Sequence, residues 1–408
     1  MRSNDWDHRY ELRTVLLLSL AFGVVGLDRF IINPLFPVMV KDLGLDYQDL
    51  GLVSGVLALA WGTSSLIGGR LSDRRGQKAV IVPAVIGFSL VVGVTGFATG
   101  LVTLLLLRAL VGLAEGAFAP AAIVAAAQAS KPSRVGLNIG LQQVALPLFG
   151  LGLGPVLAIQ LLDVLPSWHW VFGIAAVPGL VLALLLARLL RADPAPRVPR
   201  AVTAPSWREG LANRNVVCNA LGMCCWVSCL VILSALLPNY LTDHLKLDLG
   251  DMSWVLSGQG VGSLLGAVTL PALSDRFGRR PVLLVSVLIE IVALYLFVET
   301  GASPAVLFAL LLVASWANAG NLTITIGPLT IDSVPTELAS TATGIVVGGG
   351  EIIGGALAPA AAGGIAQHWG IAVVPSLALG AIVLGLVVTV FGIREPRKDY
   401  ETWSPIRT

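Results

Sequence analysis

Twelve long apolar stretches, separated by short polar gaps, constrain the fold of this chain more than any other feature. Each has the length of about 20 residues that a helix needs to cross a bilayer. In lipid, the backbone is satisfied only within helices or closed barrels, and continuously apolar stretches favour helices over strands. We therefore predict an all-α membrane protein with twelve transmembrane helices, near residues 14–37, 50–69, 79–99, 101–129, 135–162, 169–190, 215–241, 252–272, 281–300, 304–329, 339–366 and 371–393.

The overall composition supports a membrane protein and excludes several classes of function. Of the 408 residues, 56% are hydrophobic and 12% are charged, which is too apolar for a soluble chain. The net charge of +2 comes without a block of Lys or Arg, so no nucleic-acid partner is expected. The four cysteines share one apolar stretch and are expected to pack there rather than bind metal. The sequence has no nucleophile elbow, zinc-protease motif or P-loop, so we expect neither an enzyme nor a cofactor.

The positive charges predict how the chain is oriented in the membrane. With both termini in the cytoplasm, 22 of the 26 Lys and Arg residues fall on the inner side, as the positive-inside rule requires. Residues 191–214 are rich in Pro and Arg and are typical of a cytoplasmic linker. We predict a six-helix bundle over 1–190, this linker, and a six-helix bundle with a short cytoplasmic tail over 215–408. A monomer in the inner membrane is expected, with the lipid bilayer around it.

Two loops half a chain apart carry the same pattern. "GGRLSDRRGQKAV" follows the second stretch and "LPALSDRFGRRPV" follows the eighth, so that Asp73 and Asp275 are 202 residues apart. Both copies resemble the signature G-x-L-x-D-R-x-G-x-[RK] of the major facilitator superfamily, although Pro271 replaces the leading glycine of the second copy. The resemblance implies two pseudo-symmetric halves that give alternating access to a central site. We predict gating roles for Gly69, Asp73, Arg74, Asp275 and Arg276, and for Arg108 in the fourth stretch; a merely topology-setting basic loop is the alternative.

Six charged residues lie well inside the predicted helices, away from their ends, where a charge at the bilayer centre costs about 2.5–3.5 kcal/mol. Residues that survive at this cost are functional candidates by default. Asp28 and Arg29 lie about 14 residues into the first stretch, roughly 21 Å along a helix, and Glu115 has a similar depth in the antiparallel fourth stretch. The six residues are Asp28, Arg29, Arg108, Glu115, Glu290 and Glu351.

The fourth stretch, "RALVGLAEGAFAP", places Arg108, Gly112 and Glu115 on one helix face. It resembles the R-x-x-x-G-x-x-E segment of the anion:cation symporter family, and the Asp28-Arg29 pair is similar to that family and to spinster-like lipid carriers. The resemblance implies that Arg29 receives an anionic substrate group while Asp28 and Glu115 carry the coupling proton. The chemistry agrees, because a guanidinium holds a carboxylate in a planar fork and a buried carboxylate takes up a proton readily. The alternative is an ion-pair set that only fixes helix packing.

Glu351 and several uncharged polar residues complete the predicted substrate site. We expect substrate to contact Arg29, Asn33, Gln142, Asn318 and Glu351, although helix–helix hydrogen bonds explain the amides equally well. The sequence leaves open whether Glu351 is a substrate site or a proton site, and Glu290 is expected to face a neighbouring helix. The predicted function is proton-coupled symport of a small organic anion. A lysolipid carrier and a proton-coupled drug exporter are alternatives, and Arg29 would repel a cationic drug.

Overall fold

A computed structural model of the chain describes residues 7–191, 207–335 and 338–395. Within these ranges, the side chains that it does not describe are those of Leu66, Arg70, Asp73, Ser133, Trp207 and Ser340. The described part contains twelve helices that are long and apolar enough to cross a membrane, and no strand. The prediction of an all-α fold with twelve spans is therefore confirmed.

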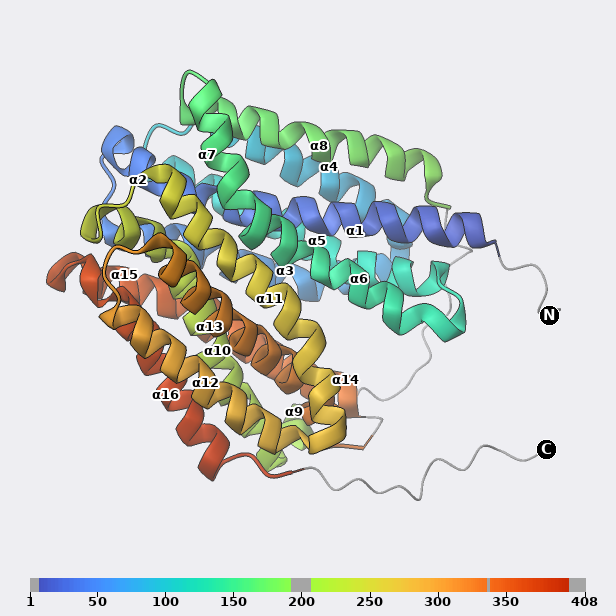
Figure 1. Cartoon of the computed structure of the whole chain (residues 1–408). Helices are drawn as coiled ribbons and strands as arrows, with labels where there is room; N and C mark the ends of the chain where they lie inside the picture. The colour runs from blue at the N-terminus through green and yellow to red at the C-terminus, as the bar shows by residue number, and fades with distance from the viewer. Residues whose placement is uncertain (1–6, 192–206, 336–337, 396–408) are drawn as a thin grey trace, which may run out of the picture.

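Six spans form the first half of the molecule (Figure 1, blue to green). They follow one another as up-and-down helices, and the first and fifth spans are each broken into shorter pieces. The elements are α1 (His8–Phe30) and α2 (Ile32–Leu43), α3 (Tyr47–Arg75), α4 (Gln77–Thr95), α5 (Leu101–Ala129), η1 (Pro132–Arg134), α6 (Val135–Pro147), η2 (Leu148–Leu153) and α7 (Gly154–Val164), and α8 (Trp168–Leu189).

The second half repeats this order (Figure 1, yellow-green to red). Its seventh, tenth and eleventh spans include π-helical turns, where the chain departs from regular α-helical hydrogen bonding. The elements are α9 (Trp207–Ala212), α10 (Arg214–Asn239) with η3 (Tyr240–His244), α11 (Leu249–Phe277), α12 (Arg279–Glu299), α13 (Pro304–Ile324) with η4 (Thr325–Leu329), α14 (Ala339–Gly349), η6 (Gly350–Leu357) and α15 (Ala358–Trp369), and η7 (Ile371–Val373) with α16 (Val374–Phe391).

The segment predicted as a linker is only partly described. Residues 192–206 lie outside the described residues, and the described remainder contains the short helix α9 and the first residue of α10, Arg214. The last helix of the first half ends at Leu189. The bundle boundaries at residues 190 and 215 thus fall next to helix ends, and the linker itself stays a prediction.

The repeated loops fold alike in the two halves. The α3–α4 turn passes through Gly76 at φ 89° and ψ 152°, and the α11–α12 turn passes through Gly278 at φ 95° and ψ 151°. In each turn the glycine N–H donates to a serine carbonyl at the end of the preceding helix, Ser72 or Ser274. A side chain disfavours such backbone angles, so the two glycines of the signature are required for the same reason.

Gly278→Ala is therefore expected to lower the free energy of unfolding by about 1–3 kcal/mol, because only glycine adopts these angles without strain. The added Cβ would also lie 3.2 Å from Oε1 of Glu395. Thermal unfolding of the purified protein in detergent measures the effect. Gly364→Ala is the matched control, since that glycine lies within α15 with open space around it, and it should unfold no earlier than the parent. Equal melting temperatures for the two variants would contradict the argument.

Glycines allow the closest helix contacts within each half. On α5, a Cβ at Gly112 would lie 2.5 Å from the carbonyl oxygen of Leu57 on α3. On α11, a Cβ at Gly262 would lie 2.2 Å from the carbonyl oxygen of Leu312 on α13. Both helix pairs are thus drawn together by small residues, as is common in membranes. The pairs α3–α5 and α11–α13 are equivalent under the repeat.

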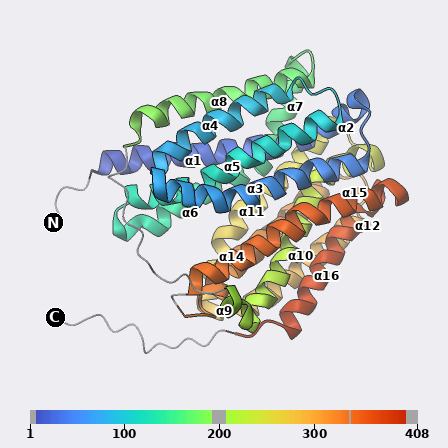
Figure 2. The same ribbon diagram turned by 180° about the vertical axis from the view of Figure 1, so that it is seen from behind.

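The two halves meet through equivalent elements and separate toward one end. α3 packs on η6 and α15, and α11 packs on η2 and α7. We call the end where α1 begins and α16 ends the terminal end, and the opposite end the distal end. Figures 1 and 2 both show the halves close together at the distal end and diverging toward the terminal end. The described conformation is therefore closed at the distal end.

Candidate functional site

Arg29 lies where the first span is broken. α1 ends at Phe30 and α2 begins at Ile32, because Pro34 has no N–H to donate to the carbonyl of Phe30. The Arg29 side chain is 12% exposed, and its guanidinium carbon lies 5.6 Å from the ring centroids of both Phe30 and Trp61. The break thus leaves a fixed cation partly accessible within the membrane span, between two aromatic rings.

Glu351 from the other half faces this cation. Its Oε2 atom lies 3.5 Å from Nη2 of Arg29, and its side chain is 17% exposed. Glu351 belongs to η6, whose π-helical turn is rich in glycine. A Cβ at Gly355, one turn later, would lie 2.9 Å from the same Oε2 atom, so the glycine leaves room for the carboxylate. The sequence identified both residues but gave no sign that they form a pair.

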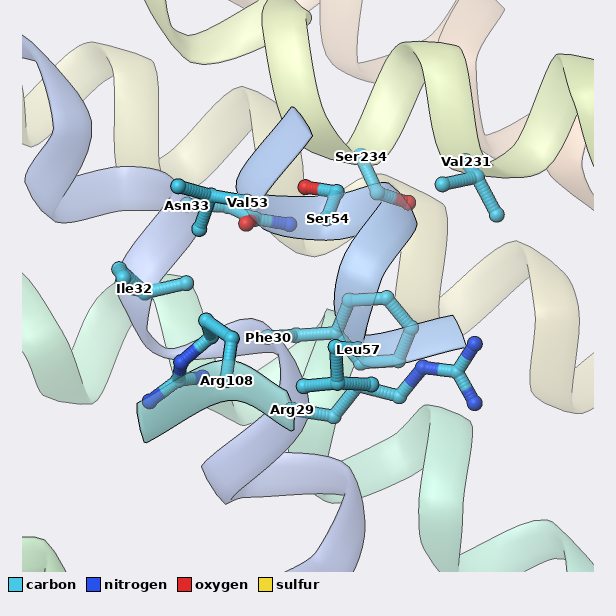
Figure 3. A pocket seen from close by; sticks show the side chains of 10 residues that line it. All are labelled: Arg29, Phe30, Ile32, Asn33, Val53, Ser54, Leu57, Arg108, Val231 and Ser234. Carbon is cyan, nitrogen blue, oxygen red and sulfur yellow. The ribbon is translucent and has the colours of Figure 1, made fainter. Parts of the chain in front are cut away.

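A small pocket lies beside Arg29, between α1, α2, α3 and α10 (Figure 3). In Figure 3, Asn33, Ser54 and Ser234 lie along one side, with Arg108 and Arg29 on the other. The two guanidinium groups point away from each other. The structure thus brings Arg29 and Asn33 to one pocket. The full lining is Arg29, Phe30, Ile32, Asn33, Val53, Ser54, Leu57, Arg108, Val231 and Ser234.

Asp28 points away from Arg29, into the first half of the molecule. Its side chain is fully buried, as are those of Glu115 and Arg108. Nη1 of Arg108 donates to the backbone carbonyl of Asp28 over 3.2 Å, and Nη2 donates to Oγ1 of Thr95 over 3.4 Å. The charges of Glu115 and Arg108 both act on Asp28. These three residues form what we call the buried charge cluster.

The carboxyl groups of this cluster are unusual because their oxygens make no hydrogen bond to the described residues. Gln142 on α6 is in the same position, with both side-chain polar atoms buried and without a described partner. Buried polar groups in proteins are nearly always hydrogen-bonded, so each exception calls for an explanation. Gln142 does not line the pocket, and its predicted contact with substrate stays a prediction.

Asn318 takes part in a buried network with Glu290, and its predicted contact with substrate stays a prediction. Nδ2 of Asn318 donates to Oε1 of Glu290 over 2.8 Å and to the backbone carbonyl of Trp226 over 3.2 Å. Nδ2 of Asn321 donates to Oε2 of Glu290 over 2.9 Å, and the Cys229 thiol donates to the same carboxyl group. The network joins α12, α13 and α10, so Glu290 faces neighbouring helices, as the sequence analysis expects.

Glu290→Leu is expected to lower stability strongly, because it leaves the amide groups of Asn318 and Asn321 without their acceptor. Each buried donor left unpaired costs about 1–3 kcal/mol. The loss should appear as a lower melting temperature in detergent. Because the network lies apart from Arg29, substrate binding by the folded fraction should be unchanged. A variant that melts like the parent would contradict the structural role of this network.

The signature loops have a partner that the motif does not name. In the second copy, Asp275 pairs with Arg279, and Nε of Arg279 lies 3.2 Å from Oδ2 of Asp332. The backbone N–H groups of Arg279 and Arg280 both donate to Glu395, over 2.7 Å each. The predicted gating residue Arg276 is exposed, with its guanidinium carbon 6.0 Å from the Phe277 ring.

The first copy of the motif is described less fully. The side chain of Asp73 lies outside the described residues. Arg74 is exposed in the last turn of α3, and a Cβ at Gly69 would lie 3.9 Å from Cβ of Pro120 on α5. The gating roles of these residues, and that of Arg108 in the buried charge cluster, stay predictions.

Polar contacts at the distal end were not anticipated from the sequence. The Tyr47 hydroxyl donates to Oδ2 of Asp243 over 3.0 Å, and the Tyr47 backbone N–H donates to Oε1 of Gln367 over 3.1 Å. These bonds tie α3 to η3 and α15 in the other half. The sequence hints at these contacts only by placing polar residues at helix ends. Every loop of the chain has such residues, so they do not single out this end. We call Tyr47, Asp243 and Gln367 the distal clasp.

Metal-ligating side chains are not gathered in one place in the described part of the chain. The described residues contain no group of three or more His, Cys, Asp or Glu side chains placed to hold a metal ion. The four cysteines are free thiols within α10, either buried or half-buried. The described groups that can contribute chemistry to the candidate site are its acids, its bases and its aromatic rings.

Comparisons with known proteins identify relatives over the whole chain. The chain is 26% identical over 269 residues to the hexuronate transporter of Bacillus subtilis (strain 168), covering 62% of this chain and 63% of that protein. This alignment spans less than two thirds of the hexuronate transporter. This chain is also 27% identical over 370 residues to a probable 4-methylmuconolactone transporter of Cupriavidus pinatubonensis (strain JMP 134 / LMG 1197). That alignment covers 88% of this chain and 84% of the relative.

A solved structure has the same fold. The crystal structure of a bacterial homologue of the human lysosomal transporter Spinster, in an inward-facing and unoccupied conformation, superposes with a TM-score of 0.74. The match covers 95% of this chain and 96% of that one at 19% sequence identity, so it shows the fold alone. The sequence profile of the Major Facilitator Superfamily matches residues 18–240 and 220–405. With twelve spans, two equivalent halves and both copies of the signature loop, the chain belongs to the Major Facilitator Superfamily, a family of membrane transporters and not of enzymes.

Proposed function

We propose that this protein is a secondary active transporter that carries a small organic anion together with protons, by alternating access between its two halves. The observation that carries the proposal is the position of Arg29. It is a permanently charged, partly exposed guanidinium, and its ion pair with Glu351 bridges the two halves. A charge inside a membrane span marks a substrate or ion pathway by default.

The surroundings of Arg29 support an anion with a flat or ring-shaped body. A guanidinium binds a carboxylate through two parallel hydrogen bonds, which fixes the orientation of the ligand. Phe30 and Trp61 flank the cation, and Asn33 with Ser54 can add neutral hydrogen bonds in the adjoining pocket. The hexuronate transporter among the relatives carries a sugar acid by its name, which agrees with this class of substrate.

Asp28 and Glu115 are the proposed sites of the coupling proton. Both carboxyl groups are fully buried; the charge of Arg29 acts on Glu115, and the charge of Arg108 acts on both acids. With both acids ionised, Arg108 alone would not balance them, because Arg29 is shared with Glu351, and an unbalanced charge is costly away from water. One proton shared between the two acids makes the cluster neutral, so it can hold or release a proton while the halves rearrange.

The arrangement in the membrane follows from the charges of the sequence. We place both termini in the cytoplasm of a cell with an inner membrane, with the halves at 1–190 and 215–408 joined by the linker 191–214. In this orientation the distal clasp faces outward, and we propose that the described conformation, whose halves diverge toward the terminal end, is an inward-facing one. We propose that the protein functions as a monomer.

Transport into proteoliposomes tests the proposal. The purified protein is reconstituted with a pH-sensitive dye inside the vesicles, and glucuronate, benzoate, lysophosphatidylcholine or tetraphenylphosphonium is added outside. A saturable acidification of the interior with glucuronate or benzoate is the expected result, because each anion would enter with protons. Lysophosphatidylcholine movement without a pH change would instead indicate an amphiphile carrier. Proton exchange driven only by tetraphenylphosphonium would indicate a drug exporter, and either outcome would refute anion symport.

A further inference from the structure

We propose that Glu351 occupies the anion receptor of the empty transporter, and that an arriving anion displaces it only when Glu351 takes up a proton. The sequence placed Glu351 among the substrate-binding residues; this inference makes it a competitor of the substrate. It rests on the proposed function, because it assumes that Arg29 receives the anion. It adds a step, the protonation of Glu351, that couples the movement of the anion to the movement of a proton.

The contact between Arg29 and Glu351 is suited to exchange. Their closest atoms are 3.5 Å apart, and Oε2 of Glu351 makes no hydrogen bond to any described residue. The pair therefore has the charge attraction of an ion pair without the aligned hydrogen bonds of a strong one. A substrate carboxylate that approaches in the plane of the guanidinium can form those bonds, so it competes successfully for Arg29.

Solvent access separates this pair from the other acids of the spans. The side chains of Arg29 and Glu351 are 12% and 17% exposed, whereas Asp28, Glu115 and Glu290 are fully buried. Both side chains are therefore partly exposed in the described conformation, although the Oε2 atom of Glu351 that faces Arg29 is itself buried. The buried acids have no such direct access.

The groups around Glu351 leave Arg29 as its charged partner among the described residues. α1 contributes Arg29, and α3 contributes Gly62 and Ala58 at this site. α10 contributes Val227, which lies against Gly355 next to the carboxylate. α10 also contributes the Cys224 thiol near this segment, which donates to the backbone carbonyl of Gly349 over 3.4 Å. When an anion takes Arg29, no other described cation is in place to compensate Glu351.

Charge balance then determines which of the empty, half-loaded and fully loaded states of the transporter can change conformation. The empty transporter has a neutral Arg29–Glu351 pair, and the fully loaded one has a neutral Arg29–anion pair beside a protonated Glu351. Anion alone leaves Glu351 unpaired, and a proton alone leaves Arg29 without its ion pair, with the charge of Glu115 still acting on it. An unpaired charge is costly where closure removes water, so the half-loaded states are held back. One proton therefore accompanies each monovalent anion at this pair, and the two ligands strengthen each other's binding.

Glu351→Gln separates the coupling step from transport itself. The neutral amide leaves Arg29 always available, so we expect glucuronate and benzoate to bind more tightly than to the parent, with a pH dependence that is smaller by one proton. In the parent, the proton that Glu351 takes up with each anion should add a factor of about ten in affinity for each unit that the pH falls. Binding is measured by thermal shift over a pH series.

Glu351→Gln should also affect exchange and net accumulation differently. Exchange of external for internal labelled anion uses only loaded states, so it should persist in Glu351→Gln. Net accumulation driven by a pH gradient needs the empty transporter to return, and it should fall to background because Arg29 would be unpaired. Glu290→Gln is the matched control: it neutralises a buried acid of the same half that lies apart from Arg29, and it should keep accumulation and pH dependence.

The outcomes distinguish this inference from the proposed function. If glucuronate and benzoate bind neither protein, or bind the Arg29→Ala variant as well as the parent, the proposed function fails and the inference falls with it. If Glu351→Gln still accumulates the anion against its gradient, or keeps the parent's pH-dependent affinity, only the inference is overturned. Exchange without accumulation, together with binding whose pH dependence is weaker than the parent's by one proton, supports both.

Discussion

Arg29→Ala is expected to abolish acidification of proteoliposomes by glucuronate or benzoate, down to the level of protein-free vesicles. The substitution removes the two charge-assisted hydrogen bonds by which the guanidinium would hold the carboxylate. Each such bond contributes about 1.5–3 kcal/mol, so the loss of binding is on the order of 100-fold or more. Arg29→Lys keeps the charge without the planar fork and should retain partial activity with weakened binding.

Loss of transport must be separated from loss of folding. Arg29→Ala leaves Glu351 without its partner, and breaking one side of an enclosed pair destabilises a protein. The double variant Arg29→Ala/Glu351→Gln removes the unpaired charge, so it should recover the melting temperature and remain inactive. Arg188→Ala is the matched control for charge, since that side chain is exposed at the end of α8. Normal uptake by the double variant would rule out Arg29 as the receptor.

Gly260→Ala is expected to trap the transporter with its distal end open. A Cβ at Gly260 on α11 would lie 1.9 Å from the backbone nitrogen of Gly152 on η2, in the other half. Neither backbone can move aside without separating the halves. Overpacking of this kind costs about 1–3 kcal/mol and here acts only on the conformation in which the halves touch. The equilibrium should shift by about 5–150-fold toward the distally open state, and transport should fall accordingly.

Gly262→Ala is the matched control for this effect. Its Cβ would lie 2.2 Å from the carbonyl of Leu312 on α13, in the same half, so it disturbs folding and not the meeting of the halves. A cysteine introduced by Thr242→Cys, next to the distal clasp, reports opening through its reaction with an impermeant maleimide. Gly260→Ala should raise the labelling rate with an almost unchanged melting temperature, and Gly262→Ala should do the reverse. Identical behaviour of the two variants would show that the α11–η2 contact does not control access.

The membrane fold follows from local features that the sequence states directly. Lipid offers no hydrogen bonds, so every apolar stretch of spanning length must become a helix, and all twelve do so in the structure. The repeated loops predict two equivalent halves, and the matching backbone angles at Gly76 and Gly278 bear this out. The breaks within spans were less predictable. Pro34 breaks the first span, whereas the glycine-rich π-helical turn around Glu351, which packs against α10 and α3, contains no proline.

The sequence singled out individual candidate residues for the site, but it did not predict which of them contact one another. Asp28 and Arg29 are neighbours in the sequence, yet helical rotation sends one into the buried charge cluster and the other to the interface. Asn318 resembled Asn33 as a polar residue in an apolar helix. The structure places Asn33 in the pocket and ties Asn318 to Glu290. Sequence alone cannot distinguish these surroundings, because both amides satisfy the same pattern.

The sequence by itself determined the number of helices, the repeat and the family resemblance. It also determined which charged residues lie inside the membrane spans and are therefore functional candidates. These depend on the local cost of placing polar groups in lipid, which each segment carries wherever it packs. Only the tertiary structure decided that Arg29 meets Glu351, 322 residues away, and that the halves touch at the distal end. Such pairings depend on helix rotation and on contacts between distant segments, which no local pattern encodes.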